Sequence, residues 1–293
     1  DAQESRGLGD VYKRQVKGLA MKKTAYIFLS TLSMVSLSLS TTSYADTALN
    51  SVAPVGVKDT LSQVMTTKKL RVCSPGDYKP FSYDNNGKFE GIDNDLVNGL
   101  AKSLGADVVM VKTSWSNLLS DFNADKCDIA VGGISISLPR QQQALFTEPY
   151  FVNGKTPLVR CPDVKKYQTI DQINRPNVRI VANPGGSNEN FAKTALSNAN
   201  LTMQKDNLVI FDEVAQRRAD VFVTEAAEAR VKQHEYKGVL CAVNPDKPLK
   251  SALNGWLIPN NDFRFKAYVD QYLNLEKLSG NLDTTINKWI PKD

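Results

Sequence analysis

The sequence predicts an α/β protein built as two lobes, each a mostly parallel sheet flanked by helices. Short apolar runs typical of strands alternate with stretches in which apolar residues recur every three or four positions, as on one face of a helix. The alternation begins again after Pro157, so the two halves of the chain share one architecture. Residues 46–293 form a segment of suitable length for one large domain or two small lobes.

In the first half, strands are expected at 70–73, 108–111 and 128–131. A helix beginning near Asp95 is predicted between the first two strands. Its apolar residues Leu96, Leu100 and Leu104 recur at four-residue spacing, and Gly105 closes it. A short helix is expected at 117–122.

The second half repeats this order. Strands are expected at 178–181, 208–210 and 221–223, and a helix at 189–195. Residues 263–278 have the pattern of a long amphipathic helix, and a shorter helix ending near Trp289 follows it. Strands that alternate with helices in this way favour a parallel sheet in each half.

The N-terminal segment carries the signature of export. Residues 21–45 combine a basic start, an apolar run at 25–39 and the small-x-small end Ser43-Tyr44-Ala45, which predicts a signal peptide cleaved after Ala45. The run is too short and serine-rich for a membrane anchor, and no cysteine follows the cleavage site to carry a lipid. Residues 1–20 precede this start, and 10–15 resemble a translated sequencing-library adapter, so we treat 1–20 as an artefact.

Charge and histidine content exclude several classes of function. Six of the 36 Lys and Arg and three of the 31 Asp and Glu lie in residues 1–45, which leaves a formal net charge of only +2. Nucleic acid binding is therefore not implied. The single histidine, His234, lies in a polar stretch and is expected at the surface, so a Ser-His triad or a histidine-rich metal site is not predicted.

Four loops follow predicted strands and are candidate ligand sites. They begin at Ser74, Gly132, Asn183 and Thr224, and Trp115 follows the second strand closely. In open α/β sheets, ligands bind beyond the carboxyl ends of the strands. A cleft between two lobes would bring these loops together.

Several of these motifs resemble a known family. Residues 76–81, 133–136 and Arg140-Gln141 resemble the polar-amino-acid class of periplasmic solute-binding proteins, over roughly 61–290. The resemblance implies a type II periplasmic-binding-protein-like fold, whose two lobes are joined by two crossing strands. Lobe 1 would comprise 46–157 and 247–293, and lobe 2 would comprise 158–246. It also implies a periplasmic protein that is free of the membrane after signal cleavage.

A narrower resemblance concerns activity. Residues 113–115, 154–157, 183–189 and 227–230 resemble the cyclohexadienyl dehydratase family. This implies a carbon–oxygen lyase that converts prephenate to phenylpyruvate, and arogenate to phenylalanine, without a cofactor or metal. The alternative is a non-enzymatic amino-acid receptor of an ABC transporter. Either function implies a small-molecule ligand and leaves a homo-oligomer open.

Residues that could hold the substrate come first from the loops. Arg140 can grip a carboxylate with two parallel hydrogen bonds, and Ser135 and the backbone of Gly133 could donate to the same oxygens. Tyr78 and Trp115 could pack against a flat ring, with packing between the lobes as the alternative, and for Trp115 the resemblance to the dehydratases favours the ligand site.

A second group comes from the resemblance to the dehydratases. Lys155 lies just before the first crossing strand and could bind a carboxylate or stabilise a departing oxygen, although many surface lysines have no specific role. Asn183 and Asn188 flank a Pro-Gly-Gly turn, and with Ser187 they are expected to contact the substrate. Turn formation and helix capping are the alternatives for the two asparagines. Glu189 is expected to be structural.

Glu225 and Glu228 lie three residues apart after the strand at 221–223. Local sequence alone favours a helix start, with Glu225 at the cap and Glu228 as its third helical residue. By resemblance, Glu225 occupies the position where amino-acid binders place an aspartate, and Glu228 matches the general acid of the dehydratases. Poor solvation and a nearby like charge would raise the pKa of Glu228 and keep it protonated.

The cysteines give one prediction. Cys161 and Cys241 lie where the chain enters and leaves the second lobe, so a disulfide between them is expected. Cys73 and Cys127 are placed on strands but at opposite ends, and they are expected to be free, buried thiols.

Overall fold

The structure, a computed structural model, describes residues 58–291. The predicted artefact and signal peptide lie outside the described residues. Among the described residues, no helix combines the length and apolarity needed to cross a membrane.

The first sheet has the strand order β5-β1-β6-β14-β7. Its strands are β5 (Asp107–Lys112), β1 (Lys69–Ser74), β6 (Ile129–Ala130), β14 (Leu257–Ile258) and β7 (Leu145–Phe146). β1 is parallel to β5 and β6, whereas β14 runs antiparallel to β6 and β7. The three strands expected from the first half are therefore confirmed, and they form the parallel part of the sheet.

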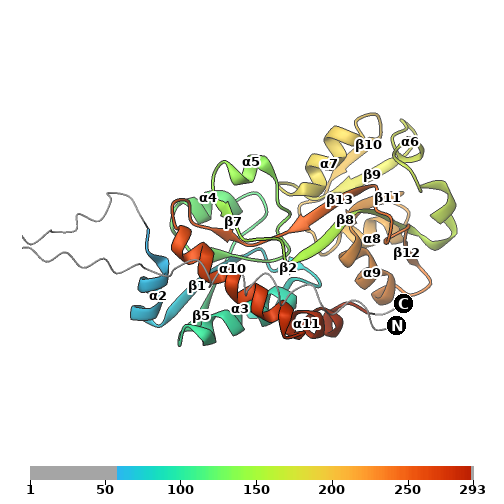
Figure 1. The fold of residues 1–293 in the computed structure, drawn as a ribbon. Helices are drawn as coiled ribbons and strands as arrows, with labels where there is room; N and C mark the ends of the chain where they lie inside the picture. Colours follow the sequence, from blue (N-terminus) through green and yellow to red (C-terminus); the bar gives the residue numbers. More distant parts are fainter. Residues whose placement is uncertain (1–57, 292–293) are drawn as a thin grey trace, which may run out of the picture. The chain divides into compact units, whose positions relative to one another are not determined.

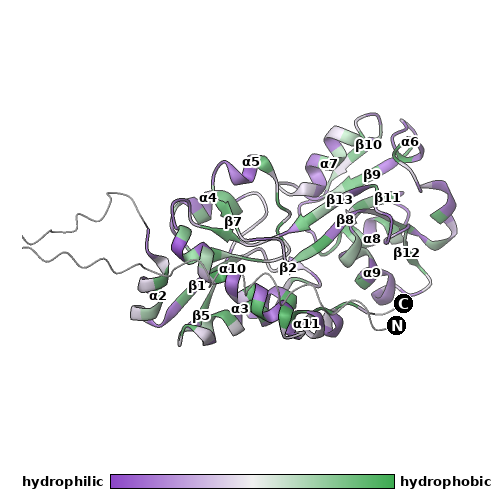
Figure 2. Cartoon of the chain, viewed as in Figure 1, coloured by the Kyte–Doolittle hydropathy of each residue, from purple (hydrophilic) through white to green (hydrophobic). Residues whose placement is uncertain are grey.

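Alternate residues of the first sheet face two apolar layers. Val72 and Ile129 point into one cluster with the helices α2 (Thr60–Thr67), α3 (Ile92–Ser103), α10 (Phe263–Leu278) and α11 (Asn281–Trp289). Cys73 and Ala130, one residue further on each strand, point into the other cluster with α4 (Leu118–Asn123). This period of two is the expected strand geometry, and Figure 2 shows hydrophobic segments on the strands beneath these helices.

The second sheet has the order β10-β9-β11-β8-β12, with β13 also paired to β8. Its strands are β10 (Asn200–Met203), β9 (Arg179–Ala182), β11 (Val221–Glu225), β8 (Phe151–Arg160), β12 (Leu240–Ala242) and β13 (Lys250–Asn254). The helices around it are α6 (Ile170–Ile173), α7 (Ser187–Ala195), α8 (Ile210–Ala215) and α9 (Ala226–Glu235), together with the 3-10 segment Cys161–Lys166. β10, β9 and β11 are parallel, and β8 is antiparallel to β11.

Two strands, the long β8 and the shorter β13, connect the sheets. β8 follows β7 of the first sheet, and β13 leads into β14 of the first sheet. The two strands pair antiparallel from Lys155 opposite Lys250 to Phe151 opposite Asn254, and Figure 1 shows them side by side between the two groups of helices. A small third sheet, β2 (Asp77–Tyr78), β3 (Ser82–Asn85) and β4 (Lys88–Glu90), and the short helix α5 (Leu138–Gln141) complete the fold.

One predicted strand is wrong. Residues 208 and 209 belong to a turn and Ile210 begins α8, whereas the strand of this region is β10 at Asn200–Met203. Leu208 and Val209 are exposed, and only Ile210 is buried. An apolar run of three residues does not distinguish a strand from a helix start, and the actual strand is a mostly exposed one at the sheet edge.

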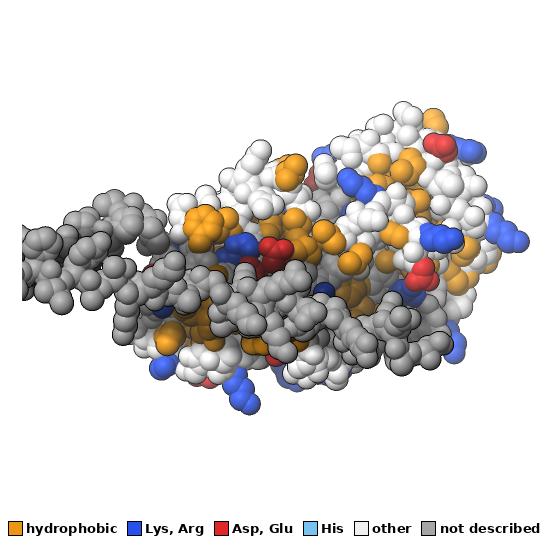
Figure 3. All heavy atoms as spheres, in the orientation of Figure 1, with side chains coloured by type: hydrophobic (Ala, Val, Ile, Leu, Met, Phe, Trp, Pro, Cys, Tyr) orange, Lys and Arg blue, Asp and Glu red, His pale blue; other side chains and the backbone are white. Residues whose placement is uncertain are grey.

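Charged side chains on the described part of the face drawn in Figure 3 include both signs, with Asp and Glu lying among Lys and Arg. This mixture agrees with the small net charge calculated for residues 46–293. The environment of the single histidine is also as predicted, because His234 is exposed on α9.

Both cysteine pairs are disulfides. The predicted Cys161–Cys241 bridge is confirmed, with a Cα–Cα distance of 4.8 Å. The prediction of free thiols at Cys73 and Cys127 is wrong, because these residues are bonded with Cα atoms 5.6 Å apart. Cys127 lies ahead of β6 rather than on it, in the loop after α4, and it packs in the same apolar cluster as Cys73.

Removing the Cys73–Cys127 bridge should destabilise the protein strongly. The bridge spans 54 residues, and in the chain-entropy model a loop of this length contributes about 4 kcal/mol. We expect the Cys73→Ser, Cys127→Ser double variant to lose about this free energy of unfolding in urea denaturation. Peptide mapping without reductant should recover both bridges from the wild type, and a free thiol at Cys73 would contradict the structure.

Candidate active site

The strand-end loops of both sheets meet around one cavity. Its lining comprises Tyr78, Trp115, Gly133, Ser135, Asn183, Gly186, Ser187, Asn188, Asn207 and Glu225. The loops predicted after β1, β5, β6, β9 and β11 all contribute to this lining, as the strand-end rule requires. Of the residues singled out from the sequence, Arg140, Lys155 and Glu228 are absent from this lining.

A second cavity adjoins the first. The two share Ser135, Gly186, Ser187 and Glu225 in their linings. Arg140 and Lys155 line the second cavity, together with Lys250 from the crossing strand β13. Three cationic side chains therefore line the second cavity, whereas Tyr78 and Trp115 line the first.

Glu225 lies at the centre of the site and is 2% exposed. It occupies the residue before α9, but its side chain makes no capping hydrogen bond. Instead, the Asn153 side-chain oxygen of β8 accepts from the Ala227 amide at 3.2 Å. The helix start expected at this position is thus present, but the Glu225 carboxylate is directed into the cavity and not at the helix end.

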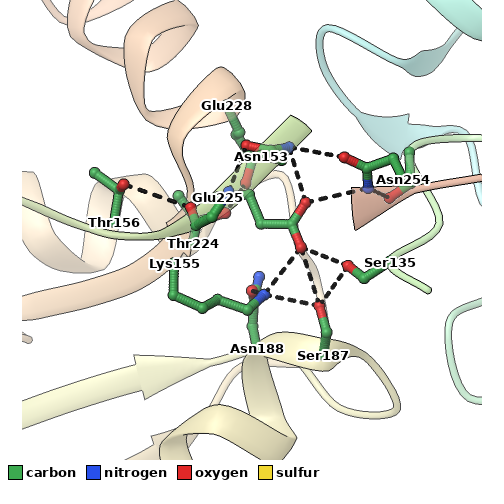
Figure 4. Close-up of polar contacts among 12 residues, drawn as sticks. Ser135, Asn153, Lys155, Thr156, Ser187, Asn188, Thr224, Glu225, Glu228 and Asn254 are labelled. Atoms are coloured by element: carbon green, nitrogen blue, oxygen red, sulfur yellow. Dashed lines mark hydrogen bonds and ion pairs between the residues drawn. The ribbon is translucent and has the colours of Figure 1, made fainter. Parts of the chain in front are cut away.

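Many donors surround the Glu225 carboxylate (Figure 4). It accepts hydrogen bonds from Asn153 (3.0 Å), Lys155 (3.2 Å), Ser187 (3.4 Å), Asn254 (3.4 Å) and Ser135. Tyr78, which the figure does not label, also donates to it at 3.0 Å. Burial alone would raise the pKa of Glu225, but the Lys155 ammonium and the hydroxyls of Ser135 and Tyr78 outweigh it and hold this pKa below its usual value. Glu225 is therefore an ionised group that organises the site.

Lys155 is buried and contacts residues of both α7 and β11. Its ammonium contacts Ser187 Oγ at 2.7 Å, Asn188 Oδ1 at 2.6 Å and Glu225 at 3.2 Å. Burial lowers the pKa of Lys155, and the charge of Glu225 counteracts this effect. The surface position considered for this lysine does not apply, because only 4% of the residue is exposed.

Glu228 lies one turn into α9, behind Glu225, and is 1% exposed. Thr224 Oγ1 donates to its Oε2, whereas its Oε1 has no hydrogen-bond partner among the described residues. Burial raises the pKa of Glu228 to about 8, and the charges of Asp77 and Glu225 act in the same direction. This carboxyl group is consequently protonated at neutral pH.

The aromatic residues form one wall of the cavity. Tyr78 and Trp115 lie edge to face with ring centroids 5.8 Å apart, a favourable arrangement for aromatic pairs. The Trp115 indole donates to Asp77 at 2.9 Å, which fixes the orientation of the ring. Both rings therefore pack within the fold and also line the cavity.

The glycine loop differs from the expectation. The amides of Gly132 and Gly133 donate to the buried Asp93 carboxylate at 2.6 and 2.7 Å, so they are not directed at the cavity. Gly133 has a φ of +70°, and a Cβ there would lie 2.6 Å from the Tyr78 ring, which explains why glycine is needed. Arg140 donates to the Ser135 carbonyl at 2.9 Å and faces the second cavity.

The Pro-Gly-Gly turn is flanked by two side-chain amides, those of Asn183 and Asn188. Asn188 donates to Asn183 Oδ1 at 3.4 Å and accepts from Lys155. The cap residue of α7 is Gly186, so capping does not explain Asn188. Glu189 accepts from the Gly185 amide at 2.6 Å and pairs with Lys193, in keeping with the structural role expected for it.

The sequence interpretation missed three asparagines. Asn153 and Asn254 lie on the crossing strands and contact Glu225, and Asn254 also donates to the Gly133 carbonyl at 2.8 Å. Asn207, from the turn before α8, lines the cavity. Asn153 and Asn254 could have been identified as asparagines on the strands that connect the two lobes, because a buried side-chain amide needs hydrogen-bond partners.

Comparison with known proteins assigns the family. The model for bacterial extracellular solute-binding proteins, family 3, matches residues 70–292. The chain belongs to this family. Its fold is therefore the two-lobed periplasmic-binding-protein fold predicted from the sequence.

Individual members of the family differ in what they do. The chain is 43% identical over 231 residues to cyclohexadienyl dehydratase of Pseudomonas aeruginosa, and the matched region covers 78% of this chain and 85% of the relative. It is 23% identical over 234 residues to an L-cystine-binding protein of Escherichia coli K12, covering 80% and 86%. A crystal structure of an ancestral amino acid-binding protein, a precursor of cyclohexadienyl dehydratase, superposes with a TM-score of 0.74 at 30% identity, covering 80% and 100%.

Proposed function

We propose that this family member is an exported, periplasmic cyclohexadienyl dehydratase, a carbon–oxygen lyase acting on prephenate and arogenate. The observation that carries the proposal is Glu228, a carboxyl group whose pKa is raised to about 8 by burial directly behind the cavity. A simple receptor has no need for a protonated acid at this position, whereas dehydration requires one. The 43% identity to a dehydratase supports the same conclusion.

The reaction removes carbon dioxide and water from the substrate ring. The bond to the ring carboxylate breaks, its electron pair enters the ring, and the ring hydroxyl departs. Hydroxide is a poor leaving group, so Glu228 delivers a proton to the hydroxyl oxygen as the C–O bond breaks, and water leaves. Prephenate then gives phenylpyruvate, arogenate gives phenylalanine, and Glu228 takes up a proton from solvent before the next turnover.

The other residues bind and orient. Arg140 anchors the side-chain carboxylate of the substrate, and Lys155 stabilises negative charge that develops as bonds break. Ser135, Ser187, Asn183 and Asn188 provide polar contacts, and Tyr78, Trp115 and the Gly133 loop enclose the ring. Closure of the lobes, with boundaries at Pro157 and Asp246, excludes water.

Purified protein mixed with prephenate at neutral pH tests this function directly. Rapid formation of phenylpyruvate is expected. The rival function is that of an amino-acid receptor, in which the ionised Glu225 carboxylate holds the ligand ammonium. Tight binding of a common amino acid without any turnover of prephenate would establish the receptor.

The pH dependence of turnover should report the acid. Because the protonated form of Glu228 donates, and its pKa is raised to about 8, turnover should stay level through neutral pH. It should fall about tenfold per pH unit above pH 8, where the proton is lost. A profile of kcat against pH from 6 to 10 checks this. A decline that sets in near pH 5 would contradict the raised pKa.

A further inference from the structure

Asn207 is a buried amide at the edge of the cavity, contributed by the turn between β10 and α8. It is 4% exposed. Its Nδ2 donates to the backbone carbonyl of Asp77 at 3.1 Å, which links the second sheet's side of the site to the first. A carbonyl can only accept, so this contact fixes the amide orientation and leaves Oδ1 as the free acceptor.

That acceptor has no partner among residues 58–291. Oδ1 of Asn207 is buried and accepts no hydrogen bond from them, and no other side chain in the described lining of this cavity has such an atom. The amides and hydroxyls around it, such as Asn183, Ser187 and Asn188, are already paired with one another or with Lys155. A buried unpaired acceptor is unfavourable, and a ligand that brings a donor to it would remove that cost.

The substrate chemistry limits the choice of donor. At neutral pH both carboxylates of prephenate are ionised and its keto group accepts, so the ring hydroxyl is its one hydrogen-bond donor. The same hydroxyl must receive a proton from Glu228, whose Oε1 also lacks a partner among the described residues. Asp77 connects the two groups, since its carbonyl holds Asn207 and its carboxylate raises the pKa of Glu228.

We propose that Asn207 contacts the substrate and that its Oδ1 accepts a hydrogen bond from the departing ring hydroxyl. This inference rests on the proposed dehydratase function and adds a specificity-determining residue to it. The hydroxyl donates its own hydrogen to Asn207 while its oxygen takes the proton of Glu228, and the resulting water leaves. Asn207 thereby orients the lone pair of the leaving oxygen toward the acid.

The test compares Asn207→Leu, which has a similar size but no acceptor, with Asn207→Asp, which keeps an acceptor and loses the donor to Asp77. We expect N207L to lower kcat/KM for prephenate by about tenfold, and N207D to retain more activity than N207L. Phenylpyruvate lacks the ring hydroxyl, so its inhibition constant should change less than about threefold in N207L. Should N207L fail to fold, Asn207→Ala removes the same acceptor without a bulky side chain.

The outcomes separate the hypotheses. Unchanged kcat/KM in N207L would overturn the inference, and so would a weakening of phenylpyruvate binding as large as the loss in kcat/KM. Either result would show that Asn207 only connects the two sheets. A loss confined to arogenate would assign the acceptor to the ammonium of that substrate and overturn the hydroxyl contact. An inactive wild type would overturn the proposed function and this inference together, whereas an active wild type matched by N207L would overturn the inference alone.

Discussion

Glu228→Gln is expected to lower dehydratase turnover severely while largely sparing substrate binding. Glutamine has nearly the same size and still accepts from Thr224, but it has no acidic proton to give to the leaving hydroxyl. General acid catalysis contributes about 10²- to 10⁴-fold, and kcat should fall by this amount. The measurement is phenylpyruvate formation under saturating prephenate, together with calorimetric titration of the variant with the substrate.

A matched control tests whether the effect belongs to the site. Glu213→Gln changes an acid of α8 that pairs with Arg218 at the surface, and it should leave kcat within about twofold, since surface substitutions of this kind have small effects. Retained turnover in Glu228→Gln would refute the role of Glu228 even if the protein proves to be a dehydratase. Loss of binding along with turnover would indicate that Glu228 positions the substrate rather than protonating it.

Lys155→Met should impair both stability and activity. The substitution leaves the Glu225 carboxylate buried without its counter-charge, and breaking a buried ion pair from one side costs about 3–5 kcal/mol. It also removes the cation that contacts Ser187 and Asn188, so kcat/KM should fall by about a hundredfold or more. Urea denaturation and the prephenate assay measure the two effects separately.

A double-variant cycle isolates the pair. Combining Lys155→Met with Glu225→Gln removes both charges and should recover part of the lost stability, because an unpaired charge is then no longer buried. Lys193→Met, on the exposed face of α7, is the control and should change the free energy of unfolding by less than about 0.5 kcal/mol. Equal destabilisation by Lys155→Met in the presence and absence of Glu225 would show that the ion pair contributes nothing.

The position of Glu225 bears on substrate choice. Its carboxylate is already paired with Lys155 and with several neutral donors, which hold its pKa below the usual value and keep it ionised. A substrate ammonium would have to compete with Lys155 for the same oxygens. Prephenate has no ammonium and avoids this competition, so we propose that it is a better substrate than arogenate.

Much of the fold followed from local patterns. Short segments encode several of the predicted elements. They include the helix α3 with its four-residue spacing, the strands β1, β5 and β9, and the amphipathic helix α10, and the structure confirms them. The prediction of a strand at 208–210 was wrong because three apolar residues carry too little information to distinguish a strand from a turn. The prediction of a free thiol at Cys127 was wrong because a loop conformation, and not a strand register, decides where that side chain lies.

The sequence by itself determined which residues have the chemistry for the site and that they follow the strands whose ends meet. It also identified Glu225 and Glu228 as neighbours on one short segment. Only the tertiary structure decided what each glutamate does. Tyr78 reaches Glu225 across 147 residues and Lys155 reaches it across 70, while at Glu228 burial outweighs the charge of Lys232 and keeps the pKa raised. Desolvation and charge pairing depend on segments far apart in the chain, so local spacing cannot assign one carboxyl group as the ionised clamp and the other as the protonated acid.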